Sequence, residues 1–444
     1  MKKLVVLGGG ESGTGAAILG ASQGYNVLVS DSGKLAKAYK KVLRNHEIEF
    51  EEGNHSVDRI LQADLVIKSP GIPDHIDLII RLKDLNIPVI SEIEFASKYS
   101  NAKTICITGS NGKTTTTSMI YQILKDAEIK VGLAGNIGKS YAWSVAEHHF
   151  DCYALEISSF QLDGMFDFRA DIAILTNITP DHLDRYQHHF QNYVDSKFRI
   201  LQNMTSSQQL IYNADDPVIT AEIKKRKPQV ELWPFSLHQE FEKGAFLKGD
   251  KIIIRNQKDE EIMSIRNLAL QGKHNTYNSM AAGIASKLMN IRNKNLKESL
   301  QEFQSLPHRM EMVANIGGVK YINDSKSTNV NSTYFALDSI NQPIIWIAGG
   351  KDKGNDYSSI KEMVGQKVKA IICLGLNNMS IHHSFGKLVP TILEAYSAQE
   401  AVEMAQRMAE TGDAVLLSPA CASFDLFENY EDRGDKFKNA VNEL

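Results

Sequence analysis

The chain has 444 residues with ordinary shares of hydrophobic (43%) and charged (23%) residues, which is the composition of a globular protein. Its 49 Lys and Arg against 53 Asp and Glu leave a formal net charge of -4, so there is no basic excess to follow a nucleic-acid backbone. The four cysteines are scattered without a C-x-x-C pair and no apolar stretch nears the roughly 20 residues of a membrane span, which predicts a soluble cytoplasmic protein without disulfides or a typical zinc cluster.

Short β-branched runs alternate with helical stretches almost throughout the chain. This alternation predicts an α/β fold whose parallel sheets are covered on both faces. At about 150 residues per domain the length suggests three domains, and we set their boundaries at residues 1–92, 93–298 and 299–444. The expected strands are residues 4–7, 26–29, 65–68 and 89–91, then 104–108, 152–157 and 172–177, and finally 344–348, 370–374 and 414–418.

Two local patterns predict where elements of the third domain begin and turn. Gly317 and Gly318 separate two alternating runs, which indicates a hairpin. Ser397 and Glu400 precede a stripe of apolar residues, which indicates a capping box at the start of a helix. Ligands of parallel sheets bind outside the carboxyl ends of the strands, so we expect the site residues in the loops that follow strands.

A glycine cluster follows the first expected strand. Gly8–Gly13 reads G-G-G-E-S-G, which satisfies G-x-G-x-x-G, and Asp31 ends the second strand roughly 20 residues later. Such a turn lets a helix N-terminus face a diphosphate, which is typical of NAD binding. Another nucleotide with a diphosphate and a ribose fits as well, and so does a turn that only packs the helix on the sheet. The cluster does not choose among these three interpretations.

A second glycine loop, Gly109–Thr115, reads G-S-N-G-K-T-T and lies between the expected strand 104–108 and a helix. Its backbone N–H groups can converge on phosphate oxygens, while Lys113 reaches the terminal phosphates and the Thr114 hydroxyl holds Mg²⁺. Ile107 stands where the standard P-loop has its first glycine. The order of strand, loop and helix still favours phosphate binding over a plain turn with an exposed lysine.

Three residues of the second domain are candidate partners of that phosphate. Glu156 ends an expected strand, where a carboxylate is placed to hold a hydrated Mg²⁺. His182 lies in a turn after the next strand, although oxygen ligands suit Mg²⁺ better than imidazole does. Lys197 stands in a helical stretch where the pattern alone favours a solvated lysine. By pattern alone, the favoured interpretation of Glu156 is a strand-end charge and that of His182 is a loop histidine.

Read in chain order, a set of sequence blocks resembles the Mur ligase and folylpolyglutamate synthase superfamily. The short phosphate loop of that superfamily has no glycine at the position of Ile107, which explains the departure from the standard P-loop. The blocks extend over all three predicted domains. They are Gly109–Thr115, Leu155–Leu162 (LEISSFQL), Asn177–Tyr186 (NITPDHLDRY), Gly272–Asn278 (GKHNTYN), Leu306–Glu311 (LPHRME), Asn323–Asn329 (NDSKSTN) and Leu417–Asp425 (LSPACASFD).

The resemblance implies the three-domain Mur ligase architecture: a Rossmann-like N-terminal domain, a P-loop central ATPase domain and a Rossmann-like C-terminal domain. It implies catalytic roles for Lys113 and Lys197 and a carbamylated side chain at Lys197, and we expect His182 as the catalytic general base. It also implies two magnesium sites, held directly or through water by Thr114, Glu156, His182 and Lys197. The ATP-binding residues that it implies are Gly109, Ser110, Asn111, Gly112, Lys113, Thr114, Thr115, Asn275, Arg309, Asp324 and Lys326.

The resemblance further implies sites for a uridine diphosphate substrate and an amino acid, so the first glycine cluster would serve a nucleotide other than NAD. The implied substrate-binding residues are Ser12, Asp31, Ser32, Gly71, Asn136, Ser158 and Gln161. The implied D-glutamate-binding residues are Thr328, Lys353, Ser423 and Tyr430. Two positions depart from the family pattern: Tyr430 replaces the usual phenylalanine, and Lys351 is an extra lysine beside Lys353.

Within the family, the blocks at 155–162, 323–329 and 417–425 look like the branch that adds D-glutamate to UDP-N-acetylmuramoyl-L-alanine with ATP. We therefore expect a monomeric, cytoplasmic amide-forming ligase that uses ATP and Mg²⁺ and binds neither nucleic acid nor membrane. The alternatives are a sister ligase for another amino acid, an NAD-dependent oxidoreductase based on the first glycine cluster, and a nucleotide switch without catalysis. The D-N-P-R motif of the diaminopimelate-adding relatives is absent.

Overall fold

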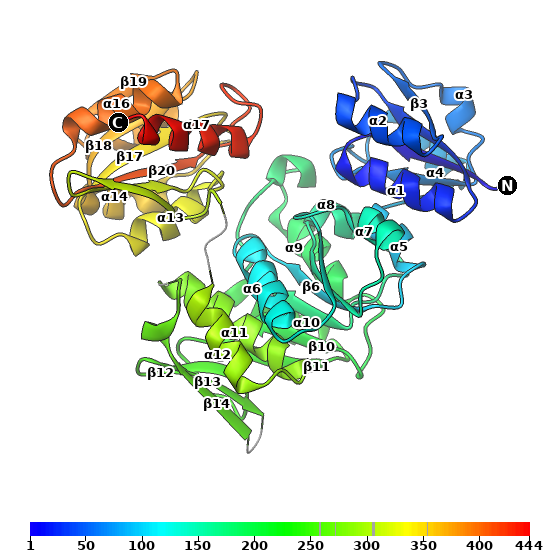
Figure 1. Cartoon of the computed structure of the whole chain (residues 1–444), viewed down its shortest axis with the longest axis horizontal. Helices are drawn as coiled ribbons and strands as arrows, with labels where there is room; N and C mark the ends of the chain where they lie inside the picture. Colours follow the sequence, from blue (N-terminus) through cyan, green and yellow to red (C-terminus); the bar gives the residue numbers. More distant parts are fainter. Residues whose placement is uncertain (257–258, 271, 304–306, 353) are drawn as a thin grey trace. The chain divides into compact units, whose positions relative to one another are not determined.

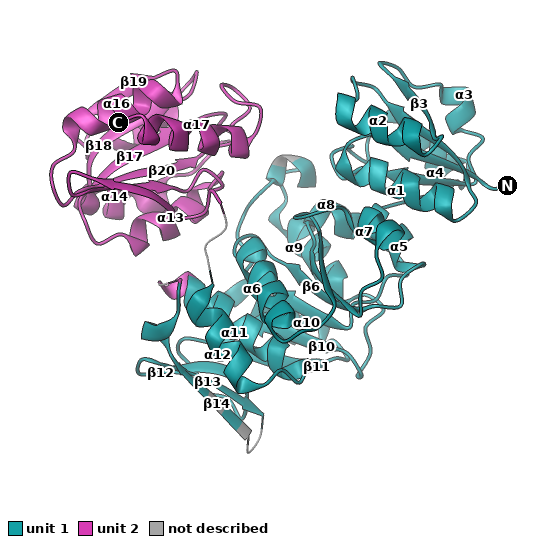
Figure 2. Ribbon diagram, viewed as in Figure 1, with its two compact units in different colours: residues 1–269, 275–303 teal, residues 270–274, 304–444 magenta. Residues whose placement is uncertain are grey.

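A computed structural model describes residues 1–256, 259–270, 272–303, 307–352 and 354–444. The chain forms two compact units (Figure 2), residues 1–269 with 275–303 and residues 270–274 with 304–444. Each unit is an α/β structure (Figure 1), so the predicted fold class is confirmed. The domain boundaries at residues 92 and 298 stay predictions.

The first sheet of unit 1 is five-stranded and parallel, in the order β3-β2-β1-β4-β5. Its central strand β1 lies between β2 and β4, so the chain reverses its direction across the sheet at the carboxyl end of β1, where the Gly8–Gly13 loop begins. The elements are β1 (Lys3–Leu7), α1 (Glu11–Ser22), β2 (Asn26–Asp31), α2 (Lys37–Asn45), β3 (Glu49–Glu52), α3 (Val57–Ile60), β4 (Leu65–Lys68), α4 (Asp77–Asp84), β5 (Val89–Ile90) and α5 (Glu92–Ser97).

The second sheet of unit 1 is nine-stranded, in the order β14-β13-β12-β11-β10-β9-β6-β8-β7. Neighbours from β7 to β12 are parallel, and β13 and β14 are added as antiparallel strands. The strands are β6 (Lys103–Thr108), β7 (Val131–Gly135), β8 (Cys152–Glu156), β9 (Ile172–Leu175), β10 (Gln209–Asn213), β11 (Glu231–Ser236), β12 (Lys243–Lys248), β13 (Lys251–Asn256) and β14 (Asp259–Ser264).

Helices cover this second sheet, and its core strand β6 is buried from Thr104 to Thr108. The α-helices are α6 (Lys113–Asp126), α7 (Tyr141–Glu147), α8 (Ser159–Asp163), α9 (Phe190–Phe198), α10 (Pro217–Arg226), α11 (Lys273–Leu288) and α12 (Asn293–Glu302). Short 3-10 turns are η1 (Leu183–Tyr186), η2 (Arg199–Leu201) and η3 (Ile265–Asn267).

Unit 2 is built on a six-stranded sheet in the order β15-β16-β20-β17-β18-β19, in which only the β15–β16 pair is antiparallel. One face packs Trp346 and Phe385 under α13, α14 and α15, and the other packs Phe437 and Val402 under α16 and α17. The elements are β15 (Glu311–Ile316), β16 (Val319–Asn323), α13 (Val330–Ser339), β17 (Ile344–Gly349), η4 (Ser358–Ile360), α14 (Lys361–Lys367), β18 (Val368–Leu374), α15 (Met379–Phe385), β19 (Ile392–Ala395), α16 (Ala398–Met408), β20 (Ala414–Ala420) and α17 (Tyr430–Asn442).

Every expected strand is present, with ends that differ by at most two residues. The hairpin is confirmed, because β15 and β16 pair around Gly317 and Gly318 at φ values of 58° and 81°. The capping box is only half right: Ser397 Oγ accepts the Glu400 N–H at 3.1 Å, but the Glu400 carboxylate accepts the N–H of Tyr396 instead of that of Ser397. Among the described residues, no helix combines the length and hydropathy needed to cross a membrane.

Within unit 1, helix α5 connects the two sheets through a buried carboxylate. Glu94 Oε2 accepts backbone N–H groups of Phe166 (3.0 Å) and Phe168 (2.9 Å), and Oε1 accepts that of Asp167 (3.1 Å). Helix α1 also packs closely on α7, where a Cβ atom at Gly15 would come within 2.2 Å of Ser140 Oγ and 2.6 Å of Trp143 Cβ. The absence of a side chain at Gly15 therefore sets how closely these helices approach.

We expect Gly15→Ala to lower the free energy of unfolding by about 1–2 kcal/mol, because overpacking a core usually costs more than the roughly 1 kcal/mol that alanine adds to a helix. Gly10→Ala is the matched control, since no atom lies within 4 Å of a Cβ built at Gly10. Urea unfolding followed by circular dichroism measures both variants. A Gly15→Ala protein as stable as the Gly10→Ala protein would contradict the packing account.

Candidate active site

The loop between β6 and α6 needs glycine at two positions. Gly109 has a φ of 144° and Gly112 a φ of 81°, in the region that side chains rarely adopt. A Cβ at Gly109 would lie 2.0 Å from Thr176 Oγ1, and one at Gly112 would lie 2.6 Å from Asn278 Oδ1. The spacing of these glycines in the sequence therefore reflects both backbone conformation and close packing.

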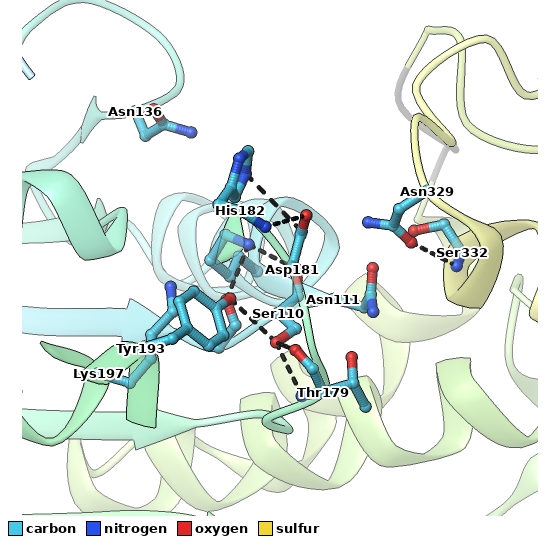
Figure 3. A network of polar contacts seen from close by, with 12 residues as sticks. Ser110, Asn111, Asn136, Thr179, Asp181, His182, Tyr193, Lys197, Asn329 and Ser332 are labelled. Carbon is cyan, nitrogen blue, oxygen red and sulfur yellow. Dashed lines mark hydrogen bonds and ion pairs between the residues drawn. The ribbon is translucent and has the colours of Figure 1, made fainter. Parts of the chain in front are cut away.

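A polar network fixes this phosphate loop to the segment after β9 (Figure 3). Ser110 Oγ donates to the Thr179 carbonyl at 2.8 Å and accepts the Thr179 N–H at 2.9 Å. The same oxygen lies 3.0 Å from the Tyr193 hydroxyl of α9. The Asn111 N–H donates to Asn177 Oδ1 at 2.9 Å. Contacts within the protein therefore hold the loop in shape.

Lys113 is the first residue of α6, and its side chain lies back over the loop. Its Nζ donates to the carbonyls of Gly109 at 2.9 Å and Ser110 at 2.8 Å. The next residue, Thr114, is 5% exposed in the first turn of the helix. An ammonium group beside a helix N-terminus is an arrangement that attracts phosphate.

Asn278 of α11, which the sequence analysis did not single out as a site residue, contacts the same loop. Its Oδ1 accepts the Thr116 hydroxyl at 3.1 Å, and its Nδ2 donates to Asn275 Oδ1 at 3.2 Å. Asn275, a predicted ATP-binding residue, is thereby linked to the first turn of α6. The two asparagines are three residues apart on one helix face, and this spacing was the signal available in the sequence.

Glu156 ends β8 with a buried carboxylate that is only half satisfied. Oε1 accepts Asn136 Nδ2 at 2.7 Å, whereas buried Oε2 has no hydrogen-bond partner among the described residues. Asn136 reaches this carboxylate because the backbone at Gly135, with a φ of 101°, passes close to the end of β8. A Cβ atom at Gly135 would lie 2.2 Å from the Glu156 carbonyl oxygen, so a side chain there would prevent this close approach. A buried carboxylate oxygen left without a donor fits a hydrated Mg²⁺ nearby.

Lys197 is fully buried, so the interpretation of a solvated helix lysine was wrong. Its Nζ donates to Thr108 Oγ1 at the end of β6 at 3.1 Å and lies 5.3 Å from the centre of the Tyr193 ring. Burial, and then the positive charge of Lys113, lower the pKa of Lys197 well below that of an ordinary lysine. The carboxylates of Asp181, Glu156 and Asp163 act in the opposite direction. A neutral amine at this position is the form that can be carbamylated.

His182 follows Asp181 in a left-handed backbone conformation, at a φ of 52°. Its Nε2 lies 3.7 Å from Asp181 Oδ2, and its ring packs edge-on against Phe160 at 5.1 Å between centroids. The imidazole is partly exposed, with 38% of its side chain accessible. Figure 3 shows Asp181 and His182 beside the Ser110–Tyr193 network.

Two further predicted substrate residues, Ser158 and Gln161, form a capping box at the start of α8. The Gln161 N–H donates to Ser158 Oγ at 3.3 Å, and Gln161 Oε1 accepts the Ser158 N–H at 2.9 Å. Their immediate role is to begin the helix that follows Glu156. The S-x-x-Q spacing carried that signal in the sequence.

The first glycine loop lies at the carboxyl end of β1, the central strand of the five-stranded sheet. Ser12 lies on α1, and the exposed Ser32 follows β2. Asp31 holds the turn, because its Oδ2 accepts the Gly9 N–H at 2.7 Å and its Oδ1 accepts the Gly33 N–H at 2.8 Å.

Gly71, in the loop after β4, is fixed by a residue that sequence reasoning missed. The Arg185 guanidinium donates to the carbonyls of Pro70 and Gly71, each at 3.2 Å, and stacks over Phe160 at 4.4 Å. Arg185 lies in the block at 177–186, but nothing in its spacing indicated a contact with a loop more than 100 residues earlier. It connects the edge of the first sheet with the segment that carries His182.

In unit 2, Asp324 follows β16 as a buried carboxylate. Its Oδ2 accepts Ser418 Oγ at 2.9 Å and its Oδ1 accepts the Met310 N–H at 3.2 Å. Burial raises the pKa of Asp324 to about 6, although the positive charge of Arg309 opposes the shift. Arg309 Nε is itself buried without a hydrogen-bond partner among the described residues. Unit 2 therefore brings these two predicted ATP-binding residues together.

The predicted D-glutamate-binding residues that the structure describes, Thr328, Ser423 and Tyr430, lie on three segments of unit 2. Lys326 Nζ is 5.3 Å above the ring of Tyr430, which begins α17. Ser423 is buried in the loop after β20, and Thr328 is half-buried just before α13. Lys353 lies outside the described residues.

Arg433, which the sequence analysis did not select, joins two of these segments. Its fully buried guanidinium donates to Ser325 Oγ at 3.0 Å, to the Ser325 carbonyl at 2.9 Å and to the Cys421 carbonyl at 3.2 Å. It thereby holds the segment of Lys326 against the segment of Ser423. An arginine in an ordinary amphipathic helix carried no sequence signal for this role.

Three family models match consecutive parts of the chain. They are described as the MurD N-terminal domain (residues 3–78), the Mur ligase middle domain (residues 107–286) and the Mur ligase glutamate ligase domain (residues 308–421). Together they cover most of the chain in the order that the three-domain architecture predicts.

Proteins of known name are similar over the full length. UDP-N-acetylmuramoylalanine–D-glutamate ligase of Christiangramia forsetii is 52% identical, and that of Bacteroides fragilis 51% identical, with 100% of each chain covered. Among solved structures, a UDP-N-acetylmuramate–alanine ligase from Thermotoga maritima matches with a TM-score of 0.64 at 17% identity over 100% of both chains. A pseudomurein peptide ligase from Methanothermus fervidus matches with a TM-score of 0.63 at 20% identity, again over 100% of both. These two structures support the fold.

The buried amine of Lys197 predicts a characteristic dependence of stability on pH. Its folded pKa lies below its unfolded value, so the unfolded chain binds more protons, and stability rises with pH up to the ordinary lysine value of about 10.4. Between about pH 8 and pH 10, we expect the free energy of unfolding of the parent protein to rise relative to Lys197→Met, by up to about 1.4 kcal/mol per pH unit. Urea unfolding in carbon-dioxide-depleted buffer keeps the amine unmodified. Parallel curves for the two proteins would contradict a buried neutral amine.

Proposed function

The chain belongs to the Mur ligase family, and we propose that it joins D-glutamate to UDP-N-acetylmuramoyl-L-alanine in an amide bond at the expense of ATP. The named relatives at 51–52% identity over the full length support this reaction and the choice of amino acid. The single structural observation that carries the proposal is the burial of Lys197 at the end of β6, within the electrostatic influence of Lys113, Glu156 and Asp181.

The chemistry requires activation of a carboxylate, because direct attack on it would expel oxide. ATP transfers its γ-phosphoryl group to the carboxylate of the substrate's L-alanine, which gives an acyl phosphate and ADP. This step brings two anions together, a repulsion that can reach several kcal/mol in a site from which water is excluded. Lys113 and the amides of Gly109–Gly112 would bind the phosphates and offset this repulsion. Lys113 would leave the carbonyls of Gly109 and Ser110 to do so.

The residues that would hold magnesium are Thr114, Glu156, His182 and Lys197, in two sites. Glu156 Oε2, which has no hydrogen-bond partner in the described part of the chain, fits such a role, and carbamylation of the neutral Lys197 amine would give that side chain a negative charge. Magnesium, when bound, would supply positive charge that screens the phosphate oxygens during transfer. Asn136 would orient the Glu156 carboxylate through the 2.7 Å hydrogen bond to Oε1.

The second step forms the amide. The ammonium of D-glutamate must lose a proton, for which we propose as the base the imidazole of His182 when it is not bound to magnesium; its Nε2 lies 3.7 Å from Asp181 Oδ2. The free amine then attacks the acyl carbon, a tetrahedral intermediate forms, and the carbon–oxygen bond to phosphate breaks as phosphate leaves. The residues proposed to bind D-glutamate are Thr328, Lys353, Ser423 and Tyr430, with Lys326 nearby.

The first sheet would bind the uridine diphosphate portion through Ser12, Asp31, Ser32 and Gly71. Asn136, Ser158 and Gln161 would line the path of the muramoyl group. Asn275, Arg309, Asp324 and Lys326 would contact ATP together with the phosphate loop. An oxidoreductase would use only the Gly8–Gly13 turn and leave the phosphate loop and Lys197 without a role. We further propose a cytoplasmic monomer, which agrees with four cysteines that are all free thiols.

We expect ADP release from ATP and UDP-N-acetylmuramoyl-L-alanine to depend on D-glutamate and not on L-glutamate, L-lysine or diaminopimelate. Lys113→Ala should lower the rate by about 10³-fold or more, because the lysine acts on charge in the transition state. Lys125→Ala, an exposed lysine in the last turn of the same helix, is the matched control and should keep the parent rate. Turnover with another amino acid would overturn the specificity, and an active Lys113→Ala protein would overturn the assignment of the phosphate loop.

An acyl phosphate also makes a separate prediction. When hydroxylamine replaces D-glutamate, the protein should convert UDP-N-acetylmuramoyl-L-alanine to a hydroxamate in an ATP-dependent reaction, detectable by mass spectrometry. Omission of ATP and the Lys113→Ala variant should each abolish the product. If an enzyme active with D-glutamate yields no hydroxamate, the phosphorylated intermediate is wrong even though the overall reaction stands.

A further inference from the structure

Unit 2 holds a cluster of three side chains that the proposed reaction does not use. Cys373 lies on β18, His382 on α15 and Glu394 on β19. One sulfur, nitrogen or oxygen atom from each lies within 4.8 Å of the others. The thiol is buried, whereas the imidazole and the carboxylate remain 45% and 37% exposed. A cation can therefore approach from solvent on the side of His382 and Glu394, while the thiol lies in the core.

The backbone brings these residues together by simple topology. Strands β18 and β19 are parallel neighbours, and Cys373 stands directly opposite Glu394 in their register. Side chains directly opposite in a sheet point to the same face. Helix α15 follows β18 and returns His382 to that face. Cys373 and Glu394 lie near the carboxyl ends of their strands, which is where α/β sheets bind ligands.

The carboxylate is already oriented by two hydrogen bonds. His382 Nε2 lies 2.5 Å from Glu394 Oε1, and Asn378 Nδ2 donates to Glu394 Oε2 at 2.7 Å. Asn378 is in turn fixed by a bond from its Nδ2 to the Gly375 carbonyl at 2.9 Å. A ligand held in place by a neighbouring amide is a common feature of protein metal sites.

We propose that Cys373, His382 and Glu394 form a binding site for a zinc-class divalent cation. The set of one thiolate, one imidazole and one carboxylate suits borderline-soft Zn²⁺, whereas Mg²⁺ prefers oxygen ligands. Three protein ligands leave a fourth tetrahedral position for water. Binding replaces the Cys373 thiol proton with the cation and releases that proton to solvent.

The distances require only small side-chain movements. Bond lengths of about 2.0–2.3 Å place the ligand atoms of a tetrahedral zinc about 3.3–3.6 Å apart. The His382–Glu394 pair, now at 2.5 Å, must open by roughly 1 Å. The thiol distances, at up to 4.8 Å, must shorten by about the same amount. The exposed imidazole and carboxylate can make these movements without a change in the core.

A cation bound by these three residues would link the edge strand β19 to strand β18 and helix α15. Strand β19 is the last strand of the sheet, paired only with β18. Edge strands are the least supported part of a sheet. Coordination would tie β19 and α15 to the buried β18 and stabilise the folded form when the cation is present.

The test uses Co²⁺, which reports a thiolate ligand by a charge-transfer absorption band in the near ultraviolet. The full chain is titrated with Co²⁺ in excess Mg²⁺, so that oxygen sites elsewhere are filled and contribute no thiolate signal. We expect a saturating thiolate band with about one equivalent of Co²⁺, reversed by Zn²⁺. Absence of the band would overturn the proposal, whatever the ligase activity.

Variants decide whether these three residues hold the cation. His382→Asn and Glu394→Gln, both at exposed side chains, should each weaken Co²⁺ binding by roughly 10-fold or more. His383→Asn on the same helix and Glu403→Gln on α16 are the matched controls and should leave the titration unchanged. Cys373→Ser should remove the thiolate band. A band that survives in Cys373→Ser, or equal affinity in His382→Asn and His383→Asn, would overturn the site.

Discussion

The burial of a lysine amine is the constraint on which the central site depends. Removing an ammonium group from water is costly, so Lys197 is neutral unless opposite charge compensates it. The fold supplies a hydroxyl, Thr108 Oγ1, at the end of β6 and the face of the Tyr193 ring. Tyr193 also reaches Ser110 of the phosphate loop, so the lysine and the loop share one support. The site is therefore prepared for a change of charge at Lys197, which carbamylation would bring.

The two strands that follow β6 in the sheet, β8 and β7, also lead into side chains of this site. Strand β8 lies beside β6 and ends in Glu156, and β7 lies beside β8 and leads into Asn136. Each turn is tight enough that Gly109 and Gly135 have no room for a side chain. Parallel neighbours in register thus place a carboxylate and an amide at the edge where the buried amine of Lys197, from helix α9, meets Thr108. The geometry of this edge is a consequence of strand register more than of any single loop.

The sequence predicted well which strands and loops form this edge of the nine-stranded sheet. It did not predict the side-chain contacts between them. The strand and loop positions followed from apolar runs and glycines, because those signals are local. Only the interpretation of Lys197 from its local pattern, as a solvated lysine, was wrong; Tyr193 and Lys197 are four residues apart on one face of α9, which marks the lysine as inward-facing. The link from Arg185 to Gly71 and that from Arg433 to Ser325 join segments more than 100 residues apart. No local pattern encodes such pairings. The Cys373–His382–Glu394 cluster escaped notice for the same reason, since only strand register brings it together.

The glycine cluster at residues 8–13 indicates how closely a helix packs on a strand, but it does not identify a ligand. A Cβ at Gly13 would lie 1.8 Å from the Gly8 carbonyl, so the motif records how closely α1 packs on β1. Asp31, the residue usually taken to select a ribose, already accepts one backbone N–H on each carboxylate oxygen, from Gly9 and Gly33. Those bonds hold the turn whichever nucleotide binds. The Gly71 loop, fixed by Arg185, is the part of the same sheet edge whose position the motif does not determine.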